Sequence, residues 1–100
     1  MIKQRYFFPE NHTGGWYVGN FPEAVLTTPN FEVSYKEFKK GEKSDGHHHT
    51  KSTEYNLVVK GAVAIKDFRR TILGPGAGFI YYPYEPSDVE FLEDSALVVI

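Results

Sequence analysis

The chain has 100 residues, a formal net charge of -2 and no cysteine. This length fits one domain with a modest core, with residues 1–30 as an N-terminal edge segment and 31–100 as the core. The charge leaves no basic excess for binding nucleic acid, and the missing cysteines exclude disulfides and thiolate metal sites. Hydrophobic residues make up 41% and aromatic residues 16%, which excludes a disordered chain and favours a β-rich interior.

The sequence also shows no membrane or export signal. No apolar run approaches the roughly 20 residues that a bilayer-spanning helix needs. The N-terminal stretch 1–9 lacks the apolar segment of a signal peptide. We therefore expect a cytoplasmic protein with no membrane partner.

Strand signals run through most of the chain. The aromatic, glycine-rich stretch Gly14–Phe21 is interpreted as an edge strand that covers one mouth of a barrel or pairs with a second subunit. Pro22–Leu26 allows one helical turn, and Phe31–Lys36 alternates apolar and polar residues as a half-buried strand does. The remaining predicted strands are Tyr55–Val59, Ala62–Lys66, Phe68–Leu73, Phe79–Tyr82, Val89–Leu92 and Ala96–Ile100. Many short strands at close spacing favour a sandwich or a closed barrel.

Two histidines and a glutamate form the most informative pattern in the sequence. His47 and His49 are separated by one residue, so in a strand both side chains point to the same face. The polar stretch 50–53 can reverse the chain and bring Glu54 beside them. Two imidazoles and one carboxylate suit a first-row divalent metal with open coordination positions. The alternative is that the histidine pair only decorates the surface.

The pattern resembles the first motif of the cupin family, G-X5-H-X-H-X3or4-E-X6-G, with Gly41, His47, His49, Glu54 and Gly61 at its fixed positions. The resemblance implies an all-β fold, a cupin-type antiparallel β-barrel also described as a jelly roll or double-stranded β-helix. It implies that the two histidines and the glutamate bind a divalent transition metal (Mn, Fe, Ni or Zn). It also implies that both glycines lie in turns.

The second cupin motif, G-X5-P-X-G-X2-H-X3-N, is matched only in part. Counted from Pro83, the family's glycine falls on Glu85 and its histidine, the fourth metal ligand, falls on Asp88. Asp88 is then either a carboxylate ligand that replaces the histidine or a turn residue that leaves water in the fourth position. Both interpretations remain open at this point.

Four further residues are candidates for the wall of the pocket. Asn56 shares a strand face with Glu54, and Tyr35, Tyr82 and Tyr84 carry hydroxyls that would orient a substrate. The alternative for each tyrosine is a core residue with its hydroxyl at the rim.

The resemblance leaves several functions open. The first expectation is a metalloenzyme that acts on a small polar substrate, a sugar or an oxo-acid, with isomerase-like or oxygenase-like chemistry. The metal would act as a Lewis acid, and Glu54 or Asp88 would move the proton. The alternatives are a non-catalytic module that binds or senses a small ligand, and a structural metal site. We expect a homodimer, because cupins commonly pair through sheet edges.

Overall fold

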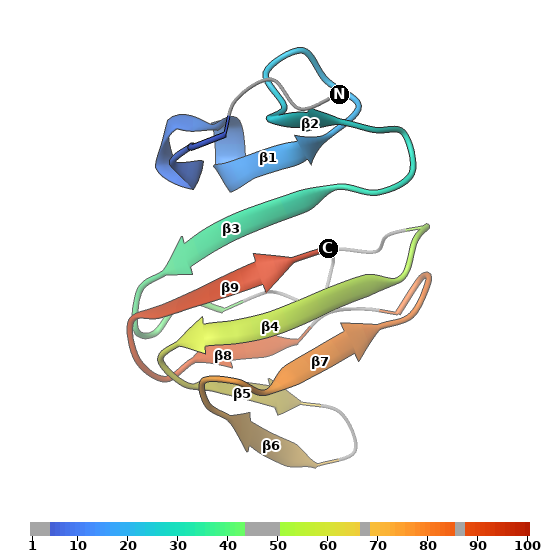
Figure 1. Cartoon of the computed structure of the whole chain (residues 1–100). Coiled ribbons are helices and arrows are strands. Elements are labelled where there is room, and N and C mark those ends of the chain that lie inside the picture. Colours follow the sequence, from blue (N-terminus) through green and yellow to red (C-terminus); the bar gives the residue numbers. More distant parts are fainter. Residues whose placement is uncertain (1–4, 44–50, 67–68, 86–87) are drawn as a thin grey trace.

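The computed structural model describes residues 5–43, 51–66, 69–85 and 88–100, and Figure 1 shows that they form strands and short turns. The strands are β1 (Trp16–Gly19), β2 (Leu26–Thr27), β3 (Val33–Phe38), β4 (Glu54–Lys60), β5 (Val63–Lys66), β6 (Arg70–Leu73), β7 (Gly78–Tyr81), β8 (Val89–Phe91) and β9 (Ser95–Val99). Two 3₁₀ turns, η1 (Pro9–Asn11) and η2 (Thr13–Gly15), precede them. The all-β prediction is therefore confirmed for the described residues.

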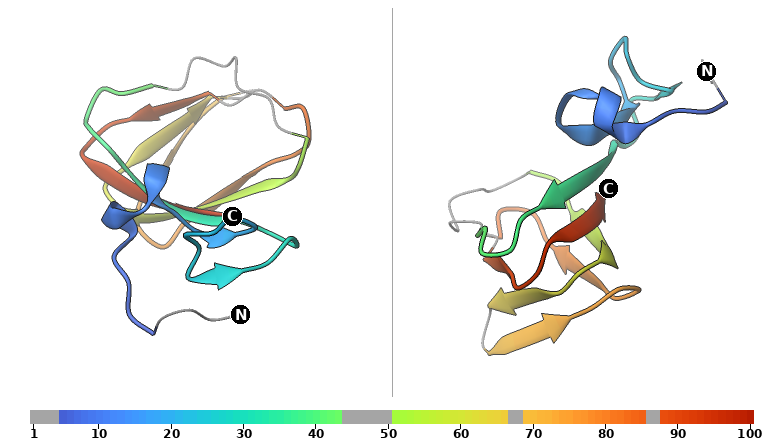
Figure 2. Two further views of the ribbon diagram at one scale, coloured as in Figure 1. Left: turned by 90° about the horizontal axis from the view of Figure 1, so that it is seen from above. Right: turned by 90° about the vertical axis from the view of Figure 1, so that its left-hand side faces the viewer.

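The strands form two sheets that enclose a common interior (Figure 2). The larger sheet has the order β2-β1-β3-β9-β4-β7, and the smaller has the order β6-β5-β8. Every strand pair is antiparallel except β1 with β2. No helix of the described residues is long and apolar enough to cross a membrane.

The segment that follows β3 joins the two sheets along one side. The Gly41 N–H donates to the Phe91 carbonyl at 2.8 Å, and the Phe91 N–H donates to the Glu42 carbonyl at 3.0 Å. Lys43 then forms an isolated antiparallel bridge with Glu90. Strand β8 is therefore paired with β5 on one edge and with residues 41–43 on the other.

The core lies between the two sheets. Its buried apolar side chains are Val58, Val63, Ile65, Tyr81, Val89, Phe91, Leu97 and Val99. Phe38 of β3 stacks on Phe91 of β8 with ring centroids 4.0 Å apart. This stacking joins the large sheet to the small one. The opposite face of the large sheet carries exposed apolar side chains, with Leu57 46%, Val59 46% and Ile80 43% exposed.

Both glycines of the histidine motif lie in turns with positive φ. Gly41 has φ 91° and Gly61 has φ 89°, a region that costs most other residues steric strain. At Gly61 a Cβ would also collide with the Ser95 Oγ atom. The expectation that these two glycines lie in turns is confirmed.

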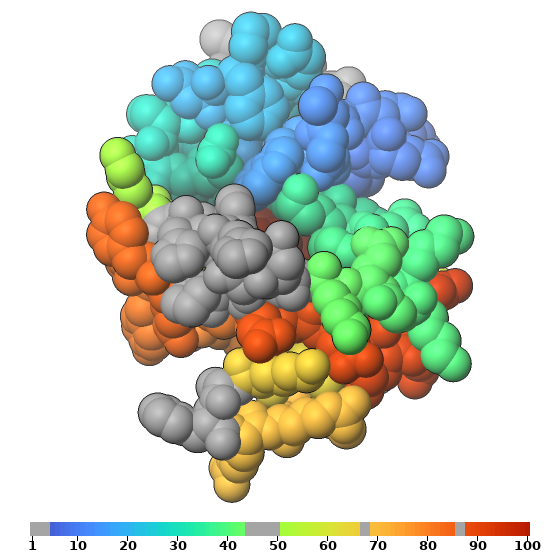
Figure 3. All heavy atoms as spheres, turned by 180° about the vertical axis from the view of Figure 1, so that it is seen from behind, coloured from blue at the N-terminus to red at the C-terminus, as the bar shows by residue number. Residues whose placement is uncertain are grey.

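The N-terminal segment extends the large sheet and does not pack across the barrel (Figure 3). The predicted strand within Gly14–Phe21 is present as β1, which pairs with β3 on the side away from β9. It is not the edge strand, because the two residues of β2 pair with it in parallel. Residues 22–25 form a turn with no helix.

The alternation in the stretch 31–36 predicts that its apolar side chains face the core. In the structure they lie on the outer face of the sheet, so that part of the prediction is wrong. Ser34 is fully buried, whereas Val33 and Tyr35 on the other face of β3 are only half-buried. Pairing with β9 sets this register, since Ser34 lies opposite the core residue Val99. A change of one residue in register moves every side chain to the other face, and the pairing with β9 outweighs the local alternation.

Candidate functional site

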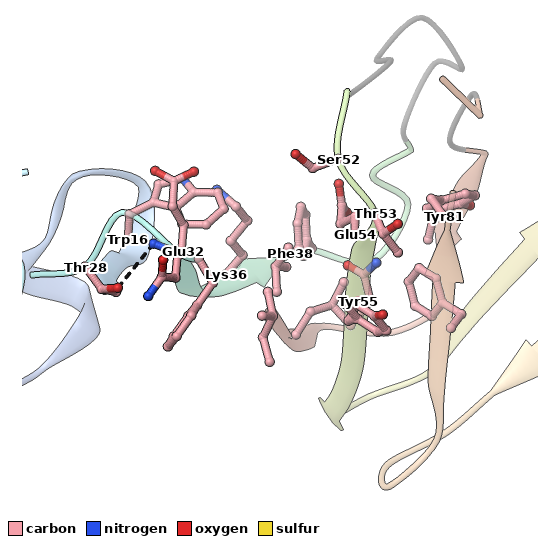
Figure 4. Close-up of a pocket in the computed structure, with 18 of the residues that line it drawn as sticks. Trp16, Thr28, Glu32, Lys36, Phe38, Ser52, Thr53, Glu54, Tyr55 and Tyr81 are labelled. Atoms are coloured by element: carbon pink, nitrogen blue, oxygen red, sulfur yellow. Dashed lines mark hydrogen bonds between the residues drawn. The ribbon is translucent and has the colours of Figure 1, made fainter. Parts of the chain in front are cut away.

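A pocket of 990 Å³ lies between the sheets and continues past β3 to the N-terminal segment. Figure 4 shows residues of both parts, from Thr28 and Trp16 at the outer end to Glu54 and Tyr81 at the inner end. The inner part is lined by Phe38, Glu54, Asn56, Phe79, Tyr81, Val89, Phe91, Leu97 and Val99. These residues come from five strands, so the pocket depends on the closed arrangement of the sheets.

Glu54 brings a carboxylate to the inner wall. It is the first residue of β4 and lies directly opposite Tyr81 of β7 in the antiparallel ladder. Side chains of directly opposed residues lie on the same face of a sheet and are close enough to interact. Figure 4 shows Glu54 and Tyr81 at the same end of the pocket. Glu54 is half-buried and keeps access to the pocket.

The Tyr81 hydroxyl is held by the backbone and stays protonated. It accepts a hydrogen bond from the Asp88 N–H at 3.1 Å. Burial raises the pKa of this hydroxyl, and the bond from Asp88 partly lowers it. The carboxylates of Asp88, Glu85 and Glu54 raise the pKa further, because negative charges disfavour the phenolate. Tyr81 therefore presents a neutral O–H group at ordinary pH.

Asn56 is a buried amide on the same wall. It is 6% exposed, and its Nδ2 atom has no hydrogen-bond partner. It lies two residues after Glu54 and opposite both Phe79 of β7 and Val99 of β9. A buried donor without a partner costs about 1–3 kcal/mol, so such a group marks a place where a ligand or water completes the bonding.

The rest of the inner wall is apolar and aromatic. Phe79 packs edge-on against Tyr81 with ring centroids 5.7 Å apart. The stacked pair Phe38 and Phe91 forms another part of the wall. The inner pocket thus combines one carboxylate, one amide and one phenol with aromatic surface.

The outer part of the pocket is more polar. Lys36 lies over the Trp16 ring at 4.9 Å from its centroid and donates to the Gly14 carbonyl at 3.1 Å. The Asn30 N–H donates to the Thr28 hydroxyl at 3.2 Å, which orders the loop after β2 (Figure 4). The N-terminal segment therefore contributes walls of the pocket.

The predicted site residues fall into three groups. His47 and His49 lie outside the described residues. Glu54 and Asn56 line the pocket together. Asp88, Tyr35, Tyr82 and Tyr84 are not among the described residues that line it, and Asp88, Tyr82 and Tyr84 are exposed.

Asp88 contributes through its backbone. Its N–H bonds the Tyr81 hydroxyl, and its carbonyl accepts the Lys66 N–H at 3.0 Å. Tyr35 is half-buried and lies directly between Ser34 and Lys36 in β3, so its side chain points to the other face of the strand. Tyr84 has φ 65°, a turn conformation that non-glycine residues seldom adopt.

The donor chemistry of the wall agrees with a metal site that the described residues supply only in part. Glu54 is a carboxylate of the kind that first-row divalent metals accept, and it borders open space in the pocket. Among the described residues no three histidine or acidic side chains gather as a metal site. Any site at Glu54 therefore needs further ligands from outside them.

Sequence reasoning missed Tyr81 and the phenylalanines of the wall. In the stretch 79–82 both alternating faces are apolar, so periodicity could not choose between Tyr81 and Tyr82. The one available signal was the predicted position of Glu54, since the residue opposite it in an antiparallel pair shares its face.

No protein-family model matches the sequence, and neither does any curated protein. Comparison of structures defines the class: the chain has a cupin fold, and small cupin superfamily proteins are its structural neighbours. The expected cupin fold is thus confirmed.

Three of these neighbours illustrate the likeness. A cupin superfamily protein from Desulfitobacterium hafniense has a TM-score of 0.65 at 13% identity, over 75% of this chain and 69% of that one. KdgF from Halomonas sp. has a TM-score of 0.65 at 25% identity, over 75% of this chain and 69% of that one. The structure of FeII HppE has a TM-score of 0.57 at 14% identity, over 68% of this chain and 40% of that one.

Proposed function

We propose that this cupin binds one divalent transition metal through His47, His49 and Glu54 and acts on a small polar molecule in the inner pocket. The observation that carries the proposal is the position of Glu54, which lines the pocket beside Asn56 and opposite Tyr81. The turn conformations of Gly41 and Gly61 support it, because they bracket the histidine motif. The iron of FeII HppE, one of the structural neighbours, is a further, weaker support.

Bound metal would supply Lewis-acid chemistry by polarising a substrate oxygen. Tyr81 would position the substrate by donating its O–H, and the aromatic wall would exclude water from one side of it. For Asp88 we propose the turn role, because its backbone is bonded on both sides and its carboxylate is exposed. His47, His49 and Glu54 would then be the protein side chains that hold the metal.

The second candidate function is a module that binds or senses a small ligand without converting it. Three carboxylates of the described residues line the pocket, namely Glu32, Glu42 and Glu54, and Glu42 already accepts the Lys39 N–H. If Glu54 binds the metal, strand β4 has no second carboxylate to act as general base. Turnover of a candidate substrate by the metal-loaded protein, compared with binding alone, separates the two functions.

The test is metal content, measured by mass spectrometry on untagged protein. Near-stoichiometric metal is expected in the wild type, with loss in His47→Ala, His49→Ala and Glu54→Ala. Asp88→Ala should keep its metal, and loss there would show that Asp88 is the fourth ligand. Glu85→Ala is the matched control, because Glu85 is an exposed carboxylate that also acts on Tyr81. A wild type that stays metal-free after incubation with Mn, Fe, Ni or Zn would overturn the proposal.

A further inference from the structure

The inner pocket offers two hydrogen-bond donors that point to the kind of ligand it takes. Asn56 Nδ2 is buried, lines the pocket and has no partner. The Tyr81 hydroxyl already accepts the Asp88 N–H, and no described residue accepts its own proton. The two residues lie on one face of the β4–β7 ladder and two rungs apart, since Asn56 pairs with Phe79, Tyr81 pairs with Glu54, and the Tyr55–Ile80 pair lies between them. Both donors can therefore reach one small ligand.

Apolar side chains make up much of the described surface around these donors. Phenylalanine, valine and leucine side chains line the pocket there, and Phe38 stacks directly on Phe91. The polar lining residues on this side are Glu42, Lys43, Ser52, Thr53 and Glu54. A sugar presents hydroxyls around its whole ring, and each buried hydroxyl without a partner is costly. A compound with its acceptor oxygens at one end and an apolar body places fewer polar groups against the apolar wall than a sugar does.

We propose that Asn56 Nδ2 and the Tyr81 hydroxyl bind the carbonyl or carboxylate oxygen of a small oxo-acid whose apolar body packs on Phe38, Phe79 and Phe91. This deepens the proposed function, because it selects the oxo-acid over the sugar for the same pocket. Both donors belong to the protein, so binding does not require the metal, although the Glu54 carboxylate opposite Tyr81 should weaken the binding of an anion when no metal is held there.

The experiment uses α-ketoisovalerate as the oxo-acid probe and D-xylose as the sugar, with binding followed by titration calorimetry. Both the protein as purified and protein treated with a chelator are titrated. The wild type is expected to bind α-ketoisovalerate in both forms and to bind D-xylose more weakly. Asn56→Leu should lose about tenfold in affinity, because one direct hydrogen bond is removed. Tyr81→Phe should lose several-fold for the same reason.

Ser34→Ala is the matched control. Ser34 is fully buried, its hydroxyl has no partner, and it lies opposite Val99, which also pairs with Asn56. It is not among the residues that line the pocket, so its removal should leave affinity unchanged. Circular dichroism checks that each variant is folded, and Asn56→Ser replaces Asn56→Leu if the latter is not.

The outcomes separate this inference from the proposed function. Tighter binding of D-xylose than of α-ketoisovalerate would overturn it, as would unchanged affinity in a folded Asn56 variant. Binding that depends on Asn56 in a protein that holds no metal would support this inference while the metal proposal fails. Stoichiometric metal together with no binding of α-ketoisovalerate would do the reverse.

Discussion

Replacement of Asn56 by leucine should stabilise the protein, which is the opposite of what most changes at a buried position do. The Asn56 amide is 6% exposed and its Nδ2 atom lacks a partner. A buried donor in that state costs about 1–3 kcal/mol. Leucine has a similar branched shape and no donor, and the pocket next to it gives space for its larger volume. We expect the free energy of unfolding to rise by about 1–2 kcal/mol.

Urea denaturation followed by circular dichroism measures this change directly. In a domain of this size each 1 kcal/mol corresponds to a rise in melting temperature of roughly 4–8 °C. Ser34→Ala should be neutral or slightly stabilising, because it removes an unpartnered buried hydroxyl without entering the pocket. If Asn56→Leu lowers the unfolding free energy by more than about 1 kcal/mol, the amide is not an unsatisfied donor and the reasoning fails.

Three further expectations concern the turn, the phenol and the outer sheet face. Gly61→Ala should lower the free energy of unfolding by at least about 3 kcal/mol, because the new Cβ adds a collision to the strain of positive φ. Gly76 has φ 89° and open space around it, so Gly76→Ala should lower it by only about 1–2 kcal/mol. Equal losses of the two variants in urea denaturation would contradict this. On alkaline titration followed by ultraviolet absorbance, Tyr81 should ionise at a higher pH than free tyrosine, because its pKa is raised. The raised pKa contributes stability to the fold that is complete below pH 10.0 and is lost as the pH rises through the pKa of Tyr81. A Tyr81→Phe protein that keeps all late-ionising absorbance would refute the assignment. For the proposed homodimer, Leu57→Lys places a charge on the exposed apolar face, and sedimentation should show weaker association; a monomeric wild type would end that proposal.

The sequence predicts strands better than it predicts their faces. Strands such as Tyr55–Val59 and Ala96–Ile100 were found because β-branched runs between turn residues signal strands locally. Which face is buried depends on the partner strand. Ser34 is buried because β9 sets its register, and β9 lies some sixty residues further along the chain. Local periodicity contains no information about that partner.

The same distinction holds for the site. Glu54 and Asn56 could be placed together because they lie two residues apart on one strand. Tyr81 could not, because its place depends on the pairing of β4 with β7. The contribution of Trp16 and Lys36 needed the addition of β1 to β3, which no short-range pattern predicts.

The position of β9 has a consequence for how the chain acquires its structure during synthesis. It is the last in sequence of the nine strands that the described residues form, yet it lies between β3 and β4 in the larger sheet (Figure 1). Until residues 95–99 leave the ribosome, β3 and β4 have no partner between them, and their edges stay open to other chains. Strand pairing over such long separations is also slow. Newly made chains should therefore be most prone to aggregation before β9 emerges, and cellular yield should depend on chaperones that protect β3 and β4 in that interval.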